Sequence, residues 1–324
     1  MYKFAVVITA YNIENYIDEA IRSVLNAVKL FSNVQIIVVD DGSTDSTLSK
    51  IRMYEDSDFF TLISKDNGGQ SSARNAALDV INSEFVMFLD GDDYIEENIF
   101  LSIDKIITTL SPDIITFDAK EFLDDGYVDT IRPPSFSRPE NCYGKILNSV
   151  EYFNHCIQEN KYNVSPCMYF FRVELLDFAS FHEGIMFEDN LFTTDLLLGK
   201  RNSKVYCLNE PLYCRRLRPS SVMTTLNYDY WFTSLKTVLL TLIRQKPSRL
   251  DVRGYRQFTS NILTTACFTF WMQANSVKKF KDFSSLLTNV LFKWPAIFLS
   301  FRFIASLILG KKYMALASFI KGRL

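Results

Sequence analysis

Short apolar runs alternate with helix-like stretches over the first 120 residues, and this alternation is the feature that most constrains the fold. The runs that read as strands are 4–9, 34–39, 60–63, 85–89 and 114–117. They are rich in Val, Ile and Phe without strict polar alternation, as expected for strands buried on both faces. The stretches that read as helices are 13–28, 44–53, 71–80 and 96–110, with Ser43 or Asp45 and Ser71 as N-caps. This order predicts an α/β fold with a mostly parallel sheet flanked by helices.

Polar residues follow the first, second and fourth of these strands. The three segments are Thr9-Ala10-Tyr11-Asn12, Asp40-Asp41 and Asp90-Gly91-Asp92-Asp93. Ligands of open α/β sheets bind beyond the carboxyl ends of the strands, so these segments are expected to face one crevice. An Asp- and Gly-rich loop is also an ordinary turn. A second acidic strand end and the later pair Glu188-Asp189 favour a divalent metal, because clustered carboxylates repel one another unless a cation lies between them.

Phosphate-binding glycine loops are missing from the chain. Neither G-x-G-x-x-G after the first strand nor G-x-x-x-x-G-K-[ST] occurs. If a diphosphate binds here, a metal must neutralise its charge through Asp92 and its neighbours. The sequence therefore favours a metal-bridged nucleotide.

Charge is unevenly distributed along the 324 residues. Residues 276–324 carry a net charge of +8, which leaves −10 for residues 1–275. The two parts are therefore expected to meet different partners. Because 48% of the residues are hydrophobic, the chain can build a large core, and intrinsic disorder is not expected.

Cysteine and histidine usage argues against a zinc site and against a disulfide framework. The 6 cysteines contain no C-x-x-C pair, and there are only 2 histidines, His155 and His182, both interpreted as structural. Reduced, buried thiols in the cytosol are expected. The first strand begins at Phe4 without a basic region before it, so no signal peptide is expected and the body should stay in the cytoplasm.

Six motifs resemble those of the family-2 glycosyltransferases with the GT-A fold, of the bacterial surface-polysaccharide type. They are TAYNIENYIDEAIRSVL, IIVVDDGSTDST, DNGGQSSARNAAL, FVMFLDGDDYI, GIMFEDNLFT and YCRRLRPSSVM. Their order and spacing agree with the family from Phe4 to about Met223. One departure is Thr9-Ala10, where many relatives have Pro before the Tyr-Asn step, and it weakens only the nucleoside contact.

The resemblance implies an inverting transfer of a hexosyl or N-acetylhexosaminyl group from a nucleotide-diphosphate sugar, with a UDP-sugar as the hypothesis, to an acceptor hydroxyl. The implied roles are nucleoside binding by Thr9, Tyr11 and Asp41, ribose proximity for Asp90, Mn²⁺ or Mg²⁺ ligation by Asp92, and general-base catalysis by Asp189. A metal opposite a single base suits inversion. The Glu188-Asp189 pair has an alternative interpretation as a first helical turn.

Three arginines are further candidates for donor binding. Arg74 either pairs with phosphate or is a solvated helix residue. Arg216 and Arg218 resemble the family segment that closes over the diphosphate, with less weight on the neighbouring Arg215. A surface basic run is the alternative for this cluster.

The domain hypothesis places a glycosyltransferase domain at 1–223, with a nucleotide-sugar half to about 121 and an acceptor half from about 122. Residues 224–324 form a helical, basic and aromatic extension, with helix breaks near Pro247 and Pro295. Its run 296–309 is too short to span a membrane. It either lies on the membrane surface, which is the favoured interpretation, or packs on the catalytic domain.

These expectations combine into one hypothesis. The chain elongates a lipid-linked glycan, such as capsule or O-antigen, as a peripheral protein on the inner face of the cell membrane. Its partners are a nucleotide-sugar donor and a glycan acceptor, with no nucleic acid. The alternatives are a sugar nucleotidyltransferase and a non-catalytic nucleotide-binding subunit.

Overall fold

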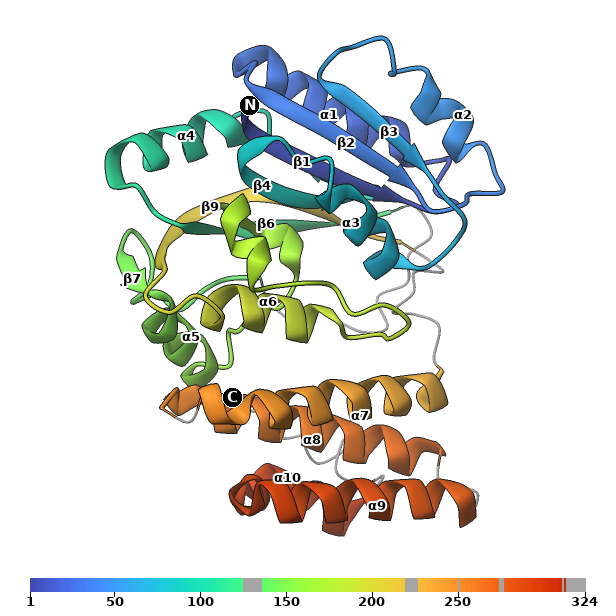
Figure 1. The fold of residues 1–324 in the computed structure, drawn as a ribbon, viewed down its shortest axis with the longest axis vertical. Helices are drawn as coiled ribbons and strands as arrows, with labels where there is room; N and C mark the ends of the chain where they lie inside the picture. The colour runs from blue at the N-terminus through green and yellow to red at the C-terminus, as the bar shows by residue number, and fades with distance from the viewer. Residues whose placement is uncertain (125–135, 219–226, 250, 274–276, 311, 313–324) are drawn as a thin grey trace. The chain divides into compact units, whose positions relative to one another are not determined.

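The computed structural model describes residues 1–124, 136–218, 227–249, 251–273, 277–310 and 312 (Figure 1). The chain divides into two compact units. The first unit comprises residues 1–184 and 192–224, and the second comprises residues 185–191 and 225–324. The second unit therefore joins a short internal segment to the helical extension.

The first unit is built on one mixed sheet. Its strands are β1 (Tyr2–Ala10), β2 (Val34–Asp40), β3 (Phe60–Ser64), β4 (Ser83–Asp90), β5 (Tyr94–Ile95), β6 (Ile114–Leu123), β7 (Ile146–Asn148), β8 (Tyr169–Arg172) and β9 (Lys204–Leu217). In the described residues their order is β3-β2-β1-β4-β8-β6-β9-β5, with β7 paired to β9. The strands β1 to β4 are parallel, as predicted, whereas β5, β7 and β8 pair antiparallel with their neighbours. The predicted α/β class with a sheet flanked by helices is confirmed.

Helices connect the strands close to the predicted positions. They are α1 (Ile17–Leu30), α2 (Thr47–Arg52), α3 (Gln70–Leu78), α4 (Ile99–Leu110), α5 (Ser149–Gln158) and α6 (Asp189–Leu198), with 3₁₀ turns η1 (Pro166–Met168) and η2 (Val173–Asp177). The carboxylate of Asp45 accepts the Thr47 N–H at 2.9 Å and so supports the start of α2, although the N-cap position is Ser46. The prediction that Ser71 caps a helix is wrong. Ser71 lies inside α3, because the N-cap position is two residues earlier, at Gly69, whose φ is 85°.

Aromatic side chains fill both faces of this sheet. Around Phe4 of β1 the ring centroids of Phe31, Phe85, Phe100 and Phe170 lie 5.3 to 6.4 Å away. Around Phe88 of β4 lie the rings of Phe171, Phe181 and Phe192. Phe4 and Phe85 are register partners, and side chains alternate along a strand, so Phe88 points to the opposite face. The helices α1 and α4 therefore cover one face and α6 covers the other.

The second unit contains the helices of the extension. They are α7 (Tyr228–Gln245), α8 (Arg253–Gln273), α9 (Val277–Lys293) and α10 (Phe301–Leu309), with 3₁₀ turns η4 (Lys246–Ser248) and η5 (Pro295–Leu299). The predicted breaks near Pro247 and Pro295 are confirmed. Phe270 of α8 stacks on Phe283 of α9 with ring centroids 4.0 Å apart, so burial of aromatic rings holds these helices together. No helix among the described residues combines the length and apolar character needed to cross a membrane.

All six cysteines lie in described residues, and each is buried and free. This confirms the predicted buried thiols. Burial raises the pKa of the Cys207 thiol to about 12, with the charge of Arg138 opposing that shift. Such a thiol is protonated and unreactive near neutral pH.

Candidate functional site

The carboxyl ends of three neighbouring parallel strands meet at one edge of the sheet. Thr9 of β1 is the register partner of Asp90 of β4, and Ala10 of β1 is the partner of Asp40 of β2. Two backbone hydrogen bonds join the loops that follow, because the Asp41 N–H donates to Ala10 and the Gly91 N–H donates to Thr9, at 2.9 and 3.0 Å. The predicted convergence of the three strand ends is confirmed.

Asp41 organises the loop that follows β3. Its carboxylate accepts hydrogen bonds from Lys65 Nζ at 2.7 Å, Asn67 Nδ2 at 3.2 Å, Gly68 N at 3.0 Å and Gly69 N at 2.7 Å. The residue is 3% exposed, so these donors replace most of its hydration. The carboxylate therefore fixes residues 65–69 at the end of β2, a task that the sequence analysis did not foresee.

A second loop contact places Tyr11 at the surface of this edge. Asn12 adopts φ 49°, its N–H donates to Ser43 Oγ at 3.0 Å, and its Oδ1 accepts the Thr44 N–H at 2.8 Å. The left-handed backbone at Asn12 turns the chain directly after Tyr11, which stays 48% exposed. An exposed ring on a fixed loop is suited to stacking on a planar ligand group.

Arg74 is buried, so its interpretation as a solvated helix residue is wrong. Its side chain is 1% exposed, and its Nη2 lies 3.1 Å from Asp90 Oδ1. Gln70 Nε2 donates to the same oxygen at 2.8 Å, and the Arg74 guanidinium lies 5.0 Å from the centre of the Phe181 ring. These contacts fix the orientation of the Asp90 carboxylate.

Gly91 separates the two carboxylates that resemble the family's acidic motif. A Cβ at this position would lie 2.6 Å from Ile13 Cδ1 and 2.8 Å from the carbonyl oxygen of Thr9. These distances are shorter than van der Waals contact, so the loop passes too close to β1 for any side chain. The glycine lets Asp90 and Asp92 stand on either side of a tight backbone passage.

Two arginines from the end of β9 hold Asp92. Arg218 Nε lies 2.7 Å from Asp92 Oδ2, and Arg216 Nε donates to the Asp92 carbonyl oxygen at 2.9 Å. The Arg218 guanidinium also lies 5.3 Å from the centre of the Tyr16 ring. Arg216 near the end of β9 thus holds the backbone of Asp92, and Arg218 directly after β9 holds its side chain.

Arg216 is the less exposed of these two arginines and makes more contacts. Its side chain is 9% exposed and pairs with Glu19 and, at 3.1 Å, with Asp124. The rings of Tyr16 and Phe122 lie 4.9 and 4.5 Å from its guanidinium. Carboxylates and rings surround this guanidinium, so Arg216 does not belong to a solvated surface run. Arg216 instead supports the acidic loop, residues 90–93, in this structure.

Arg215 contacts a different carboxylate and a different ring from Arg216 and Arg218. Its Nη1 lies 3.5 Å from Glu121 Oε1, and its guanidinium lies over the Phe136 ring at 5.0 Å. The lesser weight given to Arg215 among the arginines agrees with this placement.

Asp93 is a site residue that the sequence analysis left without a role. It is 6% exposed and accepts hydrogen bonds from Tyr213 Oη and from Arg216 N, both at 2.7 Å. Burial, followed by the negative charges of Asp92 and Asp90, raises the pKa of its carboxyl group well above the ordinary value. Asp93 therefore fastens the acidic loop to β9. The only signal in the sequence was its place in the acidic cluster.

The donor set fits a divalent cation that is bound together with a phosphate ligand. In the part of the chain that the structure describes, no group of three or more His, Cys, Asp or Glu is arranged to hold a metal ion. Mg²⁺ is usually held by one or two carboxylates, substrate phosphates and water. The Asp92 side chain, 23% exposed at a strand end, offers the hard oxygen ligands that this mode requires.

Asp189 lies in the second unit. It is the first residue of α6, where a carboxylate also favours the helix dipole, and the preceding Glu188 is 7% exposed. The other eight candidates, in the first unit, are Thr9, Tyr11, Asp41, Arg74, Asp90, Asp92, Arg216 and Arg218. No sequence pattern indicated that the segment 185–191 groups with the helical extension.

The mixed sheet flanked by helices has the GT-A fold. The solved structure of Staphylococcus aureus TarS 1–349 in complex with UDP-GlcNAc matches with a TM-score of 0.69 at 21% identity, over 96% of this chain and 85% of that one. The mannosyltransferase PcManGT from Pyrobaculum calidifontis, solved with GDP-Man and Mn²⁺, matches with a TM-score of 0.54 at 14% identity, over 98% and 86% of the two chains.

The family assignment follows from the sequence comparison. The family model described as glycosyl transferase family 2 matches residues 5–176, and the chain belongs to this family. Glycosyltransferase GlyA of Streptococcus pneumoniae is 27% identical over 268 residues, which are 78% of this chain. The match spans 35% of GlyA, so the chain corresponds to about a third of that relative's length.

Proposed function

We propose that the protein is an inverting, metal-dependent glycosyltransferase that transfers a hexosyl or N-acetylhexosaminyl group from a UDP-sugar to an acceptor hydroxyl. The observation that carries this proposal is the loop Asp90-Gly91-Asp92, held at the carboxyl edge of the sheet by Asp93 and two arginines. Membership of glycosyl transferase family 2 supports it. The UDP-GlcNAc complex of the structurally similar TarS supports the choice of donor.

The nucleoside end of the donor would lie against Thr9, Tyr11 and Asp41. Tyr11 presents an exposed ring for stacking, and Asp41, which fixes the loop 65–69, follows β2, the strand next to β1. A base hydrogen-bonding to Asp41 would have to share or displace one of its donors, such as Lys65. Asp90, oriented by Arg74 and Gln70, would face the ribose.

The diphosphate end would lie against Asp92 and Arg218. A Mn²⁺ or Mg²⁺ ion held by Asp92, when bound, neutralises the diphosphate charge. Arg218 supplies a planar donor fork that matches phosphate, once it exchanges its contact with Asp92 for one with the ligand. Arg216 contributes indirectly by holding the Asp92 backbone in place.

The reaction needs one base on the acceptor side. The acceptor hydroxyl oxygen forms a bond to the anomeric carbon while the bond from that carbon to the diphosphate oxygen breaks. The hydroxyl proton passes to the Asp189 carboxylate, and the electron pair leaves with the nucleoside diphosphate. Attack from the face opposite the leaving group inverts the anomeric centre, and a positioned base contributes roughly 10²- to 10⁴-fold to the rate.

The acceptor in this proposal is a lipid-linked surface glycan, reached by a protein that binds peripherally to the inner face of the membrane. TarS is described as a poly(ribitol-phosphate) β-N-acetylglucosaminyltransferase, which supports a surface-polymer acceptor. Helix α9 supports a membrane contact, because Phe280, Leu291 and Phe292 are 61%, 51% and 84% exposed and Lys281 lies beside them. Exposed aromatic residues with neighbouring lysines are typical of helices that lie in the membrane interface.

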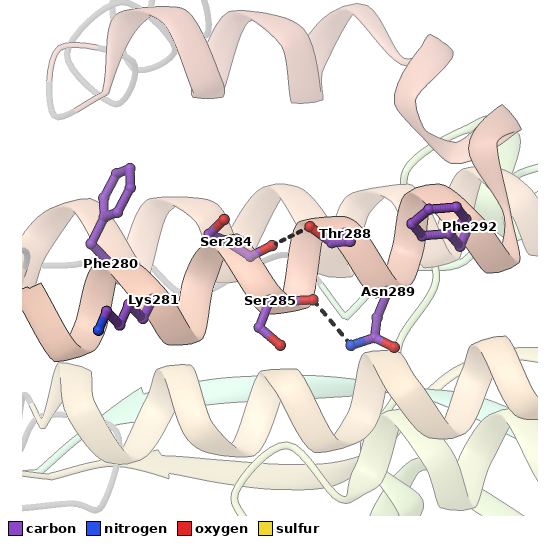
Figure 2. A pocket seen from close by; sticks show the side chains of 7 residues that line it. All are labelled: Phe280, Lys281, Ser284, Ser285, Thr288, Asn289 and Phe292. Atoms are coloured by element: carbon purple, nitrogen blue, oxygen red, sulfur yellow. Dashed lines mark hydrogen bonds between the residues drawn. The ribbon is translucent and has the colours of Figure 1, made fainter.

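Figure 2 shows side chains of α9 that line a surface pocket, with Phe280 and Phe292 at its two ends. Between them Thr288 Oγ1 donates to the Ser284 carbonyl at 2.9 Å, and Asn289 Nδ2 donates to the Ser285 carbonyl at 3.1 Å. These side chains satisfy donors within their own helix, which lowers the cost of removing this face from water.

Calorimetric titration with UDP, GDP, CDP and dTDP, each with and without Mn²⁺, tests the donor and metal assignments. We expect tight, Mn²⁺-dependent binding of UDP that Asp92→Ala abolishes and that Asp79→Ala, a change at an exposed carboxylate after α3, leaves intact. Product stereochemistry by NMR then tests inversion. Binding without sugar transfer would favour a non-catalytic subunit, and release of pyrophosphate from UTP and a sugar phosphate would favour a nucleotidyltransferase.

A further inference from the structure

The segment 185–191, which contains Asp189, is attached to helix α7 of the extension. The Met186 N–H donates to Ser234 Oγ at 3.0 Å, and Ser234 is 1% exposed. The Phe187 ring meets Trp231 edge to face, with centroids 5.7 Å apart and an interplanar angle of 84°. Two side chains one helical turn apart on α7 therefore hold the two residues that precede Glu188-Asp189.

The backbone of this segment needs such support. Phe187 has φ 64°, a left-handed conformation that is unfavourable for an aromatic residue. Its carbonyl oxygen accepts hydrogen bonds from both the backbone and the side chain of Asn190, at 3.1 and 3.0 Å. The turn at Phe187 sets the direction in which α6 begins, and so sets the place of Asp189. Unusual backbone conformations of this kind persist where surrounding contacts determine them.

Helix α7 is itself held in the helical unit. Phe232, between the two contact residues in sequence, lies 6.0 Å from the Phe270 ring and 6.2 Å from the Phe283 ring. Phe270 and Phe283 stack on one another, so α7, α8 and α9 share one aromatic core. The position of Ser234 and Trp231 is therefore set by the aromatic core of Phe232, Phe270 and Phe283.

We propose that Ser234 and Trp231 are positioning residues for the acceptor-side carboxylate, and that the helical extension takes part in catalysis by fixing the turn at Phe187. This inference rests on the proposed role of Asp189 as the general base. It assigns α7 a task that is independent of any membrane contact made by α9. A misplaced base reduces turnover, whereas donor binding at the strand ends uses other residues.

Steady-state kinetics of four full-length variants test the inference. Ser234→Ala and Trp231→Ala remove the two contacts, and Ser260→Ala and Trp294→Ala are matched controls in the same unit. Ser260 is 3% exposed and donates to the Ile297 carbonyl, and Trp294 stacks on Tyr255. We expect kcat to fall roughly 10- to 100-fold for the first pair, with the Kd for UDP and the donor KM within about twofold of wild type. The controls should lower Tm comparably and leave kcat within about threefold.

Conservative replacement provides a second measurement. Trp231→Phe keeps an aromatic edge for Phe187 and should recover most of the lost kcat, which a purely destabilising change would not explain. Equal kcat values for Ser234→Ala, Trp231→Ala and their controls, with Asp189→Asn inactive, would overturn the inference alone. Full turnover by Asp189→Asn would instead overturn the proposed role of Asp189.

Discussion

Arg218 Nε lies 2.7 Å from Asp92 Oδ2, so the residue that we propose holds a cation is paired with a positively charged side chain. The two side chains are 18% and 23% exposed, and such pairs contribute roughly 0–1 kcal/mol. A pair of this strength is easily exchanged for a metal ion and a diphosphate. In the function we propose, Arg218 would exchange this contact for the diphosphate when the donor binds.

The first prediction concerns this pair. Arg218→Gln removes the competing cation, so Mn²⁺ should bind the nucleotide-free protein roughly 2- to 5-fold more tightly while kcat/KM for the donor falls. Arg215→Gln is the control, because Arg215 pairs with Glu121 and lies over the Phe136 ring. Mn²⁺ titration by electron paramagnetic resonance gives the two affinities. Unchanged Mn²⁺ affinity in Arg218→Gln would show that the pair does not compete with metal.

The second prediction concerns Gly91. Gly91→Ala forces a Cβ to within 2.8 Å of the Thr9 carbonyl, and we expect a loss of roughly 1–3 kcal/mol in the free energy of unfolding with much weaker UDP binding. Gly144→Ala is the comparison, because Gly144 has φ 69° and open space around its Cβ position. Gly144→Ala should lower the free energy of unfolding through backbone strain alone and should bind UDP as wild type does. Urea denaturation and calorimetry measure both quantities, and normal UDP binding by Gly91→Ala would contradict the close passage.

The third prediction concerns Asp41. Asp41→Asn places an amide among four hydrogen-bond donors, and at least one of them loses its acceptor. We expect a loss of roughly 1–3 kcal/mol in stability and faster proteolysis between residues 65 and 69. Asp66→Asn changes an exposed carboxylate in the same loop and should change neither quantity. Limited proteolysis read by mass spectrometry decides the outcome, and equal cleavage of both variants would remove Asp41 from this role.

The fourth prediction concerns pH. The Lys120 ammonium, 2.8 Å away, and then the Cys214 thiol hold the pKa of Glu96 below its ordinary value of 4.5. A lowered folded pKa contributes stability above the unfolded value that is lost as the pH falls through the folded pKa. Glu96→Gln should therefore lower the free energy of unfolding by a few tenths of a kcal/mol at pH 7 and leave it unchanged near pH 3.

Glu97→Gln is the matched control for this change, because Glu97 is the exposed neighbour of Glu96. It should show no difference from wild type at either pH. Denaturation curves at the two pH values provide the comparison. A Glu96→Gln effect that is equal at pH 3 and pH 7 would mean that the charge of Glu96 is not its source.

The sheet edge was predictable because it depends on local patterns. Buried strands without polar alternation imply parallel pairing, and parallel pairing brings the residues after β1, β2 and β4 to one edge. Helix starts were less predictable. The segment before Ile17 satisfies the apolar pattern of a helix, but it is occupied by a turn in which the Tyr16 N–H donates to Ile13.

Whether an arginine is covered by the protein or solvated depends on contacts between distant parts of the chain. Arg74 is buried because Phe181 and Asp90 surround it, and Arg216 is buried because Glu19 and Asp124 do. No local pattern distinguishes a buried arginine from a solvated one. The same is true of Asp93, whose partner Tyr213 is 120 residues away.

Strand β9 has a consequence for how this family can diversify. It carries Tyr213 and Arg216, which bind Asp93, and the residue directly after it, Arg218, pairs with Asp92. One stretch of six residues, 213–218, thus serves the fold and, in the function we propose, the diphosphate end of the donor. A lineage that acquires a new sugar or acceptor is free to vary segments elsewhere. A change in 213–218, however, would disturb the acidic loop and Arg218 together. Engineers who alter specificity should therefore leave 213–218 intact.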